Sequence, residues 1–239
     1  MIMFESFIQY LITHQVPEYT IVVLLYLPIV SMFITFSRYV FGWKSLSIYT
    51  TIFLTFALYE LAKTPAGSID ILKGILQGGI IVSLITSTVL FLQRPTKDIH
   101  LHYLSKISII VSAVSFLIFV MLYAAVAINI ASFAQLSIVA VLMIVLVTES
   151  FVRTYIRKGM YKAMNYITNT ILLSFIIFII IAQNPFKQAV LNHPEFAIYA
   201  VIADLILGRW RGLRVSEYFR FKDINLKDSN DTQSPKKSA

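Results

Sequence analysis

Seven long apolar runs divide this chain, and they constrain its fold more than any other feature of the sequence. Each run approaches the roughly 20 apolar residues that a helix needs to cross a bilayer. The runs do not alternate polar and apolar residues as barrel strands would. We therefore predict an all-α membrane protein, a bundle of seven transmembrane helices. The predicted spans are Thr20–Ser37, Leu46–Ala62, Ile69–Leu92, Ile107–Ile128, Phe133–Val152, Ala163–Ala182 and Phe196–Gly208.

The composition is typical of a chain that lies in lipid. Hydrophobic residues make up 58% of its 239 residues and charged residues only 13%, roughly half the charged share of a soluble domain. The chain has no cysteine, which excludes disulfides and cysteine-based metal or thiol sites. Its formal net charge is +8, but no nucleic-acid-binding motif accompanies that charge, so we expect no nucleic-acid partner.

The basic residues sort to one side of the predicted spans. Of the 20 Lys and Arg residues, 17 fall on one side, and only Lys63, Lys73 and Lys187 fall on the other. Short loops rich in Lys and Arg stay in the cytoplasm. We therefore predict that the N-terminus lies outside and the C-terminus in the cytoplasm.

The same pattern divides the chain into three regions. Residues 1–19 precede the first span, and we expect an extracytoplasmic, interfacial N-terminal helix there. Residues 20–222 form the seven-helix membrane domain. Residues 223–239 are polar and small, and we expect a disordered cytoplasmic tail.

Two details concern helix length and packing. The seventh run is short for a span, and we expect it to extend backward into residues 191–195 or forward past Trp210. Gly74 and Gly78 are four residues apart in the third run. Small residues at this spacing indicate that a neighbouring helix approaches closely.

Two acidic residues near the span ends are candidate functional groups, because a charge in lipid is costly. Glu60 stands three residues before Lys63, and Glu149 stands four residues before Arg153. Each acid can therefore pair with a base on its own helix face. The alternative for both is an ion pair at the membrane edge without a function.

A third acidic residue, Asp204, lies deepest in a predicted span. We expect a basic residue from another helix to neutralise it, and Arg38 is the candidate. A functional role and a purely structural one both remain open for this residue.

The densest basic cluster follows the last run and contains Arg209, Trp210, Arg211 and Arg214. One interpretation is attraction to anionic lipid headgroups. The other is a pocket for phosphate or carboxylate, which arginine binds with two parallel hydrogen bonds. The sequence has no catalytic triad, phosphate loop or zinc-protease motif. We predict no catalytic residue, metal site or cofactor.

Three stretches together resemble one known family. They are Ser37–Val40 with Lys44 after it, Thr148–Thr154, and Gly208–Arg214 followed by Glu217. They resemble the seven-helix membrane domain of bacterial proteins in which that domain follows an inactive transglutaminase-like extracytoplasmic domain. The resemblance runs from about Val23 to Phe221, and the Gly208–Arg214 stretch is its most specific part.

The resemblance implies a multi-pass protein of the bacterial inner (cytoplasmic) membrane. It also implies two neighbouring genes, for an ATP-grasp glutamate-ligase-like enzyme and for a retropepsin-like peptidase. The family's extracytoplasmic domain does not precede the first span here, so a separate extracytoplasmic subunit is a further expected partner.

Our leading hypothesis is a non-enzymatic module that docks a cytosolic partner, such as the ATP-grasp-type enzyme, through its basic cytoplasmic edge. The first alternative is a transporter for a small anionic peptide or amino-acid conjugate, with Asp204 on its path. The second alternative is an intramembrane enzyme that uses Glu149 or Asp204 as an acid or base. The residues that we expect to bind the partner or an anionic ligand are Arg38, Lys44, Glu149, Arg153, Asp204, Arg209, Trp210, Arg211, Arg214 and Glu217.

Overall fold

The structure, a computed structural model, consists of helices joined by loops in the residues that it describes, with one isolated β-bridge between Lys63 and Ile69. The described residues are 10, 14, 17–64, 68–98, 103–128 and 136–209, with side chains for all of these except 93–98 and 103. The helices are α2 (Glu18–Phe36), η1 (Ser37–Phe41), α3 (Ile48–Leu61), α4 (Ile71–Asp98), α5 (Tyr103–Ala127), α7 (Ile138–Lys158), α8 (Met160–Ile181), α9 (Asn184–Asn192) and α10 (Glu195–Arg209).

Five helices in the described part are long and apolar enough to cross a membrane: α2 with η1, α4, α5, α7 and α8. A sixth span arises if α9 and α10, which meet at a bend of 93°, are taken together. The remaining apolar helix, α3, has 14 residues and therefore extends only about 21 Å. Each of the seven predicted runs thus contains one apolar helix of this fold.

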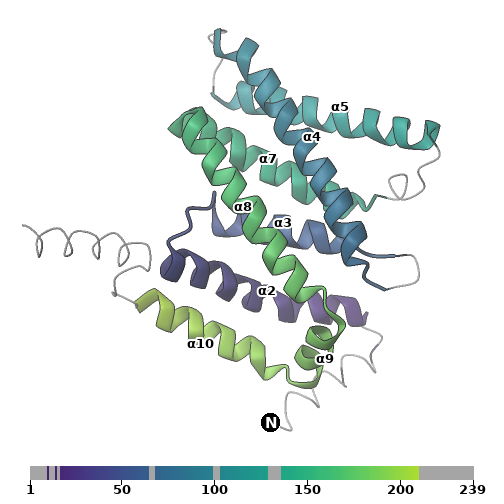
Figure 1. The fold of residues 1–239 in the computed structure, drawn as a ribbon, viewed down its shortest axis with the longest axis vertical. Coiled ribbons are helices and arrows are strands. Elements are labelled where there is room, and N and C mark those ends of the chain that lie inside the picture. The colour runs from purple at the N-terminus through teal and green to yellow at the C-terminus, as the bar shows by residue number, and fades with distance from the viewer. Residues whose placement is uncertain are drawn as a thin grey trace, which may run out of the picture.

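The helix α3 lies at the centre of the bundle, in contact with α2, α4, α7 and α8. In Figure 1, α10, α2, α3, α7 and α5 run alongside one another, and α4 and α8 cross them diagonally. Most residues of α3 are buried. A short helix with irregular backbone at its ends is tolerated at membrane depth when protein surrounds it, because the backbone groups then find partners.

Hydroxyl groups on the buried face of α3 are satisfied within the bundle. Thr51 Oγ1 donates to the Ser47 carbonyl oxygen at 2.9 Å, and Thr55 Oγ1 donates to the Thr51 carbonyl oxygen at 2.8 Å. Ser174 on α8 donates its own hydroxyl to the same Thr51 carbonyl oxygen at 3.2 Å. These bonds let polar residues lie in an apolar core without an unmade hydrogen bond.

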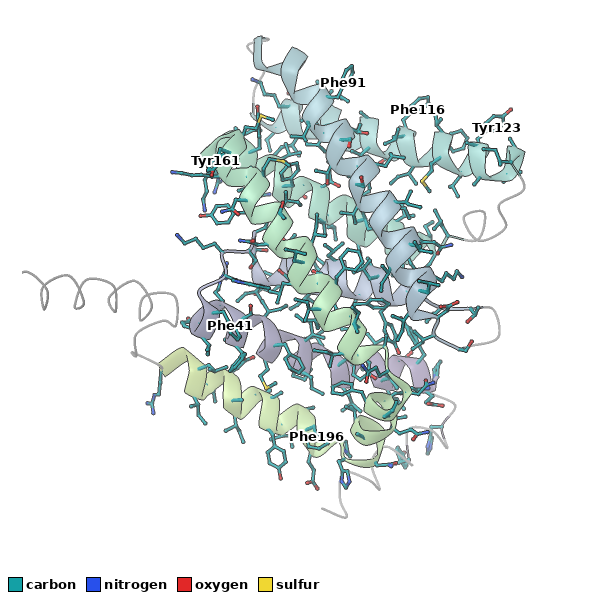
Figure 2. The ribbon with its side chains drawn as sticks, in the orientation of Figure 1. Phe41, Phe91, Phe116, Tyr123, Tyr161 and Phe196 are labelled. Atoms are coloured by element: carbon teal, nitrogen blue, oxygen red, sulfur yellow. The ribbon has the colours of Figure 1, made fainter. Side chains whose placement is uncertain are left out.

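Many large apolar side chains point outward, as expected for a surface in lipid (Figure 2). Phe91, Phe116 and Tyr123 are each about 70% exposed or more. The buried aromatic side chains, which include Phe151 and Phe178, lie between the helices instead. The outer face is therefore at least as apolar as the core, which fits a bilayer as the surrounding solvent.

Close helix packing at the two glycines of α4 is confirmed. A Cβ atom on Gly74 would lie 2.7 Å from Phe178 Cζ and 2.8 Å from Ala62 Cβ. A Cβ atom on Gly78 would lie 2.1 Å from Leu58 Cδ2. Glycine at these positions lets α4 approach α3 and α8 more closely than any larger residue allows.

The predicted backward extension of the seventh span reaches only one residue. The helix α10 begins at Glu195, and α9 turns away from it by 93°. Pro194 explains the break, because a proline disfavours helical backbone at the preceding residue. His193 has an extended φ of −129° accordingly. Of residues 1–19, where the interfacial N-terminal helix is predicted, the structure describes only 10, 14 and 17–19, and α2 begins at Glu18. The tail of residues 223–239 and any extension past Trp210 lie outside the described residues.

Candidate functional site at the basic end of the bundle

Consecutive helices run in alternate directions, so the bundle has two distinct ends (Figure 1). At one end, α2–η1, α7 and α10 finish and α3, α5 and α8 begin. The cations of this end whose side chains are described are Arg38, Lys44, Lys106, Arg153, Arg157, Lys158, Lys162 and Arg209. We call it the basic end. The separation of charge that the sequence predicts is thus present in the fold.

A π-helical turn closes the first span at the basic end. The turn η1 covers Ser37–Phe41 and is followed by Gly42, which has a φ of +73°. This left-handed conformation suits glycine, because it has no Cβ atom. The chain then reverses, and the backbone N–H of Trp43 donates to the Ser37 carbonyl oxygen at 3.4 Å. Single π turns of this kind occur frequently at functional sites.

The segment 42–47, which we call the connecting loop, is fixed against α8. The backbone N–H of Leu46 donates to Thr170 Oγ1 at 2.9 Å. Asn169 Nδ2 donates to the Lys44 carbonyl oxygen at 3.3 Å. These contacts join residues more than 120 positions apart in the chain. They hold the backbone that carries Lys44 in a defined place.

A pocket of about 360 Å³ lies between η1, the connecting loop, the end of α7 and α8. Three cations line it, Arg38, Lys44 and Lys158, and its lining contains no acidic residue. Arg38 donates to the Ser45 carbonyl oxygen at 3.3 Å. The Lys158 ammonium lies 4.6 Å from the ring centre of Tyr166, which also lines the pocket. The arrangement suits an anionic ligand.

Ser45 also lines this pocket, and its side chain is only 4% exposed. Its Oγ atom is buried and has no hydrogen-bond partner among the residues that the structure describes. Sequence reasoning missed Ser45, Lys158 and Tyr166 as site residues. Lys158 and Tyr166 are distant from Arg38 in the sequence, so no local pattern could have placed them in this group, whereas Ser45 follows Arg38 by only seven residues.

The predicted pairing of Glu149 with Arg153 is confirmed. Arg153 Nη2 lies 2.5 Å from Glu149 Oε1 on the surface of α7, and both side chains are more than a third exposed. Neither residue lines the pocket that contains Arg38 and Lys44. The pair therefore belongs to the outer surface of the basic end.

The predicted pairing of Asp204 with Arg38 is wrong for the part of the chain that the structure describes. Arg38 donates to the connecting loop, which joins η1 to α3. Asp204 lies on α10, which packs against α2 instead (Figure 1). Asp204 Oδ1 is buried without a hydrogen-bond partner there. Arg209, also predicted as a site residue, is exposed at the end of α10. The predicted site residues Trp210, Arg211, Arg214 and Glu217 lie outside the described residues.

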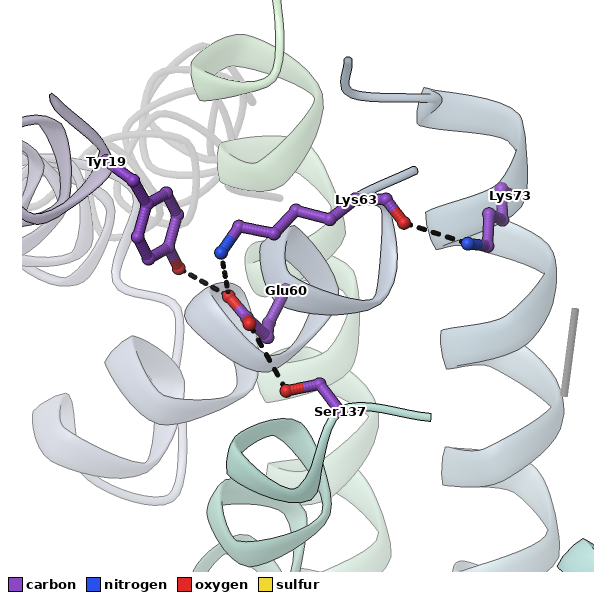
Figure 3. A network of polar contacts seen from close by, with 5 residues as sticks. All are labelled: Tyr19, Glu60, Lys63, Lys73 and Ser137. Atoms are coloured by element: carbon purple, nitrogen blue, oxygen red, sulfur yellow. Dashed lines mark hydrogen bonds and ion pairs between the residues drawn. The ribbon is translucent and has the colours of Figure 1, made fainter. Parts of the chain in front are cut away.

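A second polar cluster lies at the opposite end of the bundle, centred on Glu60 (Figure 3). Lys63 Nζ lies 2.9 Å from Glu60 Oε2, which confirms the predicted pair. The Tyr19 hydroxyl donates to the same oxygen, and Ser137 Oγ donates to Glu60 Oε1 at 3.2 Å. Lys73 Nζ donates to the Lys63 carbonyl oxygen at 2.8 Å. The cluster links α2, α3, α4 and the start of α7, so its role is to hold the helices together.

Few other charged or metal-binding groups come together among the described residues. They contain no group of three or more His, Cys, Asp or Glu side chains that could hold a metal ion. Lys187, the third cation opposite the basic end, lies 2.9 Å from Glu18 at the surface. The pocket lined by Arg38, Lys44 and Lys158 is therefore our candidate functional site.

Comparison with known proteins identifies the family to which this chain belongs. Residues 3–225 match the family described as seven transmembrane helices usually fused to an inactive transglutaminase. No curated protein and no solved structure matches the chain. The family match spans every helix from α2 to α10 and agrees with the apolar outer surface. The chain therefore belongs to this family of seven-helix, multi-pass membrane proteins.

Proposed function

We propose that this protein is a bacterial inner-membrane module that docks the acidic face of a cytosolic enzyme onto its basic end. The support for this proposal is the distribution of charge. Eight cations with described side chains lie at the basic end, against three at the opposite end. Under the positive-inside rule, the basic end faces the cytoplasm.

The docking surface consists of the exposed cations of the basic end rather than of the pocket itself. Arg157, Lys162 and Arg209 are exposed, and no hydrogen bond or ion pair within the described chain engages their side chains. Arg153, four residues before Arg157 on α7, is exposed with its partner Glu149. Unpaired cations on one face attract an acidic partner and orient it during the encounter.

An ATP-grasp-type ligase is the partner class that we propose, since the resemblance of the chain to its family implies such an enzyme. The module itself would supply position rather than chemistry. Catalysis by Glu149 is disfavoured, because Arg153 occupies its carboxylate at the exposed surface of α7. The acid–base hypothesis for Asp204 is disfavoured because Asp204 does not line the two neighbouring pockets, whose side chains are apolar apart from Tyr199.

Charge reversal tests the docking. The full-length protein would carry Arg157→Glu, Lys162→Glu and Arg209→Glu, and would be purified gently from its native membrane beside the wild type. We expect the ATP-grasp-type enzyme to co-purify with the wild type, to dissociate at high salt, and to be lost from the triple variant. Screening of exposed charges explains the salt effect.

The matched control is Lys187→Glu at the opposite end, where only an exposed ion pair with Glu18 is lost. This variant should keep the partner. Retention of the enzyme by the triple variant would contradict the proposal, as would a wild-type protein from which no such enzyme is recovered.

A further inference from the structure

The pocket at the basic end has the composition of an anion site. Arg38 from η1, Lys44 from the connecting loop and Lys158 from α7 all line it, and no acidic side chain of the described residues does. Lys44 and Lys158 are exposed, so water weakens the repulsion between the three charges, and an anion between them would reduce it further. The carboxylate of α7, that of Glu149, is paired with Arg153 and does not line the pocket.

Two of the polar groups in this pocket have hydrogen-bonding capacity left. The buried Ser45 Oγ has no partner among the described residues. A guanidinium has five N–H donors, and Arg38 uses one of them for a long bond of 3.3 Å to a carbonyl oxygen. Buried polar groups in folded proteins are nearly always paired, so a hydroxyl left alone beside three cations indicates a missing acceptor. The buried hydroxyls of Thr51 and Thr55 on the adjacent helix, by contrast, are all paired.

We propose that this pocket binds a phosphate group. A phosphate carries up to two negative charges and presents several acceptor oxygens, which suits one guanidinium, two ammonium groups and a hydroxyl better than a single carboxylate does. The backbone around it is already ordered by η1 and by the bonds of the connecting loop to Asn169 and Thr170. The ligand therefore meets a preformed site.

The pocket volume of about 360 Å³ is within the usual range for small-molecule sites, so the phosphate carries a further organic group. Tyr39 and Trp43 line the pocket, and each is 37% exposed. Aromatic residues of this kind mark the membrane–water interface. The phosphate can come from a lipid headgroup or from a soluble phosphate ester, and the two sources share the same recognition chemistry.

This inference goes beyond the docking proposal and uses different residues. Docking is tested by Arg157, Lys162 and Arg209, none of which lines the pocket. The pocket is tested by Lys44 and Ser45. Loss of either function can therefore be observed without loss of the other.

Fluorescence of Trp43 provides the measurement. The chain has two tryptophans, so Trp210→Phe in the full-length protein leaves Trp43 in the pocket lining as the sole reporter. The purified variant would be titrated with inorganic phosphate at constant ionic strength. In a second series it would be titrated with phosphatidylglycerol, with phosphatidylcholine as the neutral lipid. We expect a saturable change in emission.

The two series distinguish the sources. Saturation by inorganic phosphate that phosphatidylglycerol does not displace indicates a soluble phosphate ester. Saturation by phosphatidylglycerol but not by phosphatidylcholine indicates a lipid headgroup. Both results support the phosphate site. The absence of a saturable response to either compound would overturn it.

Matched variants separate the pocket from general surface charge. Lys44→Ala and Ser45→Ala should each weaken binding by about tenfold, since each removes a donor to a charged oxygen. Ser45→Ala removes a hydroxyl that has no described partner, so the fold should persist. Lys162→Ala removes an exposed cation outside the pocket and should change binding less than about twofold. Equal weakening by Lys44→Ala and Lys162→Ala would contradict a specific site.

Discussion

Both carboxylate oxygens of Glu60 accept hydrogen bonds, Oε2 from Tyr19 and Lys63 and Oε1 from Ser137. The side chain is only 15% exposed, and the Lys63 ammonium also lies 3.0 Å from the centre of the Tyr19 ring. A charge that is mostly withdrawn from water is stabilised only when such partners surround it. Glu60 thus connects three segments that are distant in sequence, namely α2, the end of α3 and the start of α7.

Replacing this charge should destabilise the bundle. We expect Glu60→Gln to lower the free energy of unfolding by about 1–3 kcal/mol, because the Lys63 ammonium loses its charged partner. Thermal unfolding of the purified protein in detergent would measure the change. The control is Lys187→Met, which breaks an ion pair whose side chains are 34% and 55% exposed and should cost at most about 1 kcal/mol. Equal losses of unfolding free energy in the two variants would contradict the expectation that the buried Glu60 pair contributes more to stability than the exposed Lys187 pair.

At this scale the sequence reveals local pairs and misses distant ones. The pairs Glu60–Lys63 and Glu149–Arg153 follow from helical spacing, and both are present. The contacts of Glu60 with Tyr19 and Ser137 span 41 and 77 residues, so no periodic pattern contains them. Complementary charge alone does not place two residues together, since tertiary packing decides which neighbours they meet.

The helix α4 depends on close contact at Gly74. Its neighbours there are Phe178 Cζ, Ala62 Cβ and the Leu58 carbonyl oxygen, the last at 3.2 Å from the position of an added Cβ. A short methyl side chain and a backbone oxygen cannot rotate away. Gly79, one residue after the predicted Gly-x-x-x-Gly pair, has only Phe175 Cζ at 3.9 Å.

Alanine substitutions should separate these two positions. Gly74→Ala is expected to lower the free energy of unfolding by about 1–3 kcal/mol, because the added methyl group overpacks the interface with α3 and α8. Gly79→Ala is expected to leave stability unchanged or to raise it by up to about 1 kcal/mol, since alanine favours a helix over glycine. Thermal unfolding of both variants measures the difference. A Gly74→Ala protein as stable as Gly79→Ala would contradict the packing described above.

At the scale of whole elements, the apolar runs predict the helices well and their ends less well. The seven runs each contain a helix, because hydrophobicity over about 20 residues is a strong local signal. The end of α7 at Lys158 lies six residues beyond the predicted span, since its last turns are polar and can extend into water. The connecting loop and its pocket were not predictable, because partners on α8 fix that backbone.

At the scale of the whole molecule, charge rather than shape distinguishes the two ends of the bundle. The basic end contains the pocket with Arg38, Lys44 and Lys158. The opposite end contains the Glu60 cluster and the surface pair of Glu18 with Lys187. Docking of a cytosolic enzyme requires the basic end to face the cytoplasm, so this orientation is the central claim.

Cysteine labelling tests the orientation directly, because the native chain has no cysteine. Lys162→Cys places a thiol at the start of α8 on the basic end, and Gln188→Cys places one on α9 at the opposite end. Both positions are exposed. A membrane-impermeant maleimide applied to intact bacterial spheroplasts should label the cysteine at position 188, and should label the one at position 162 only after the membrane is permeabilised. The reverse pattern would contradict the proposed orientation and, with it, the docking of a cytosolic enzyme at the basic end.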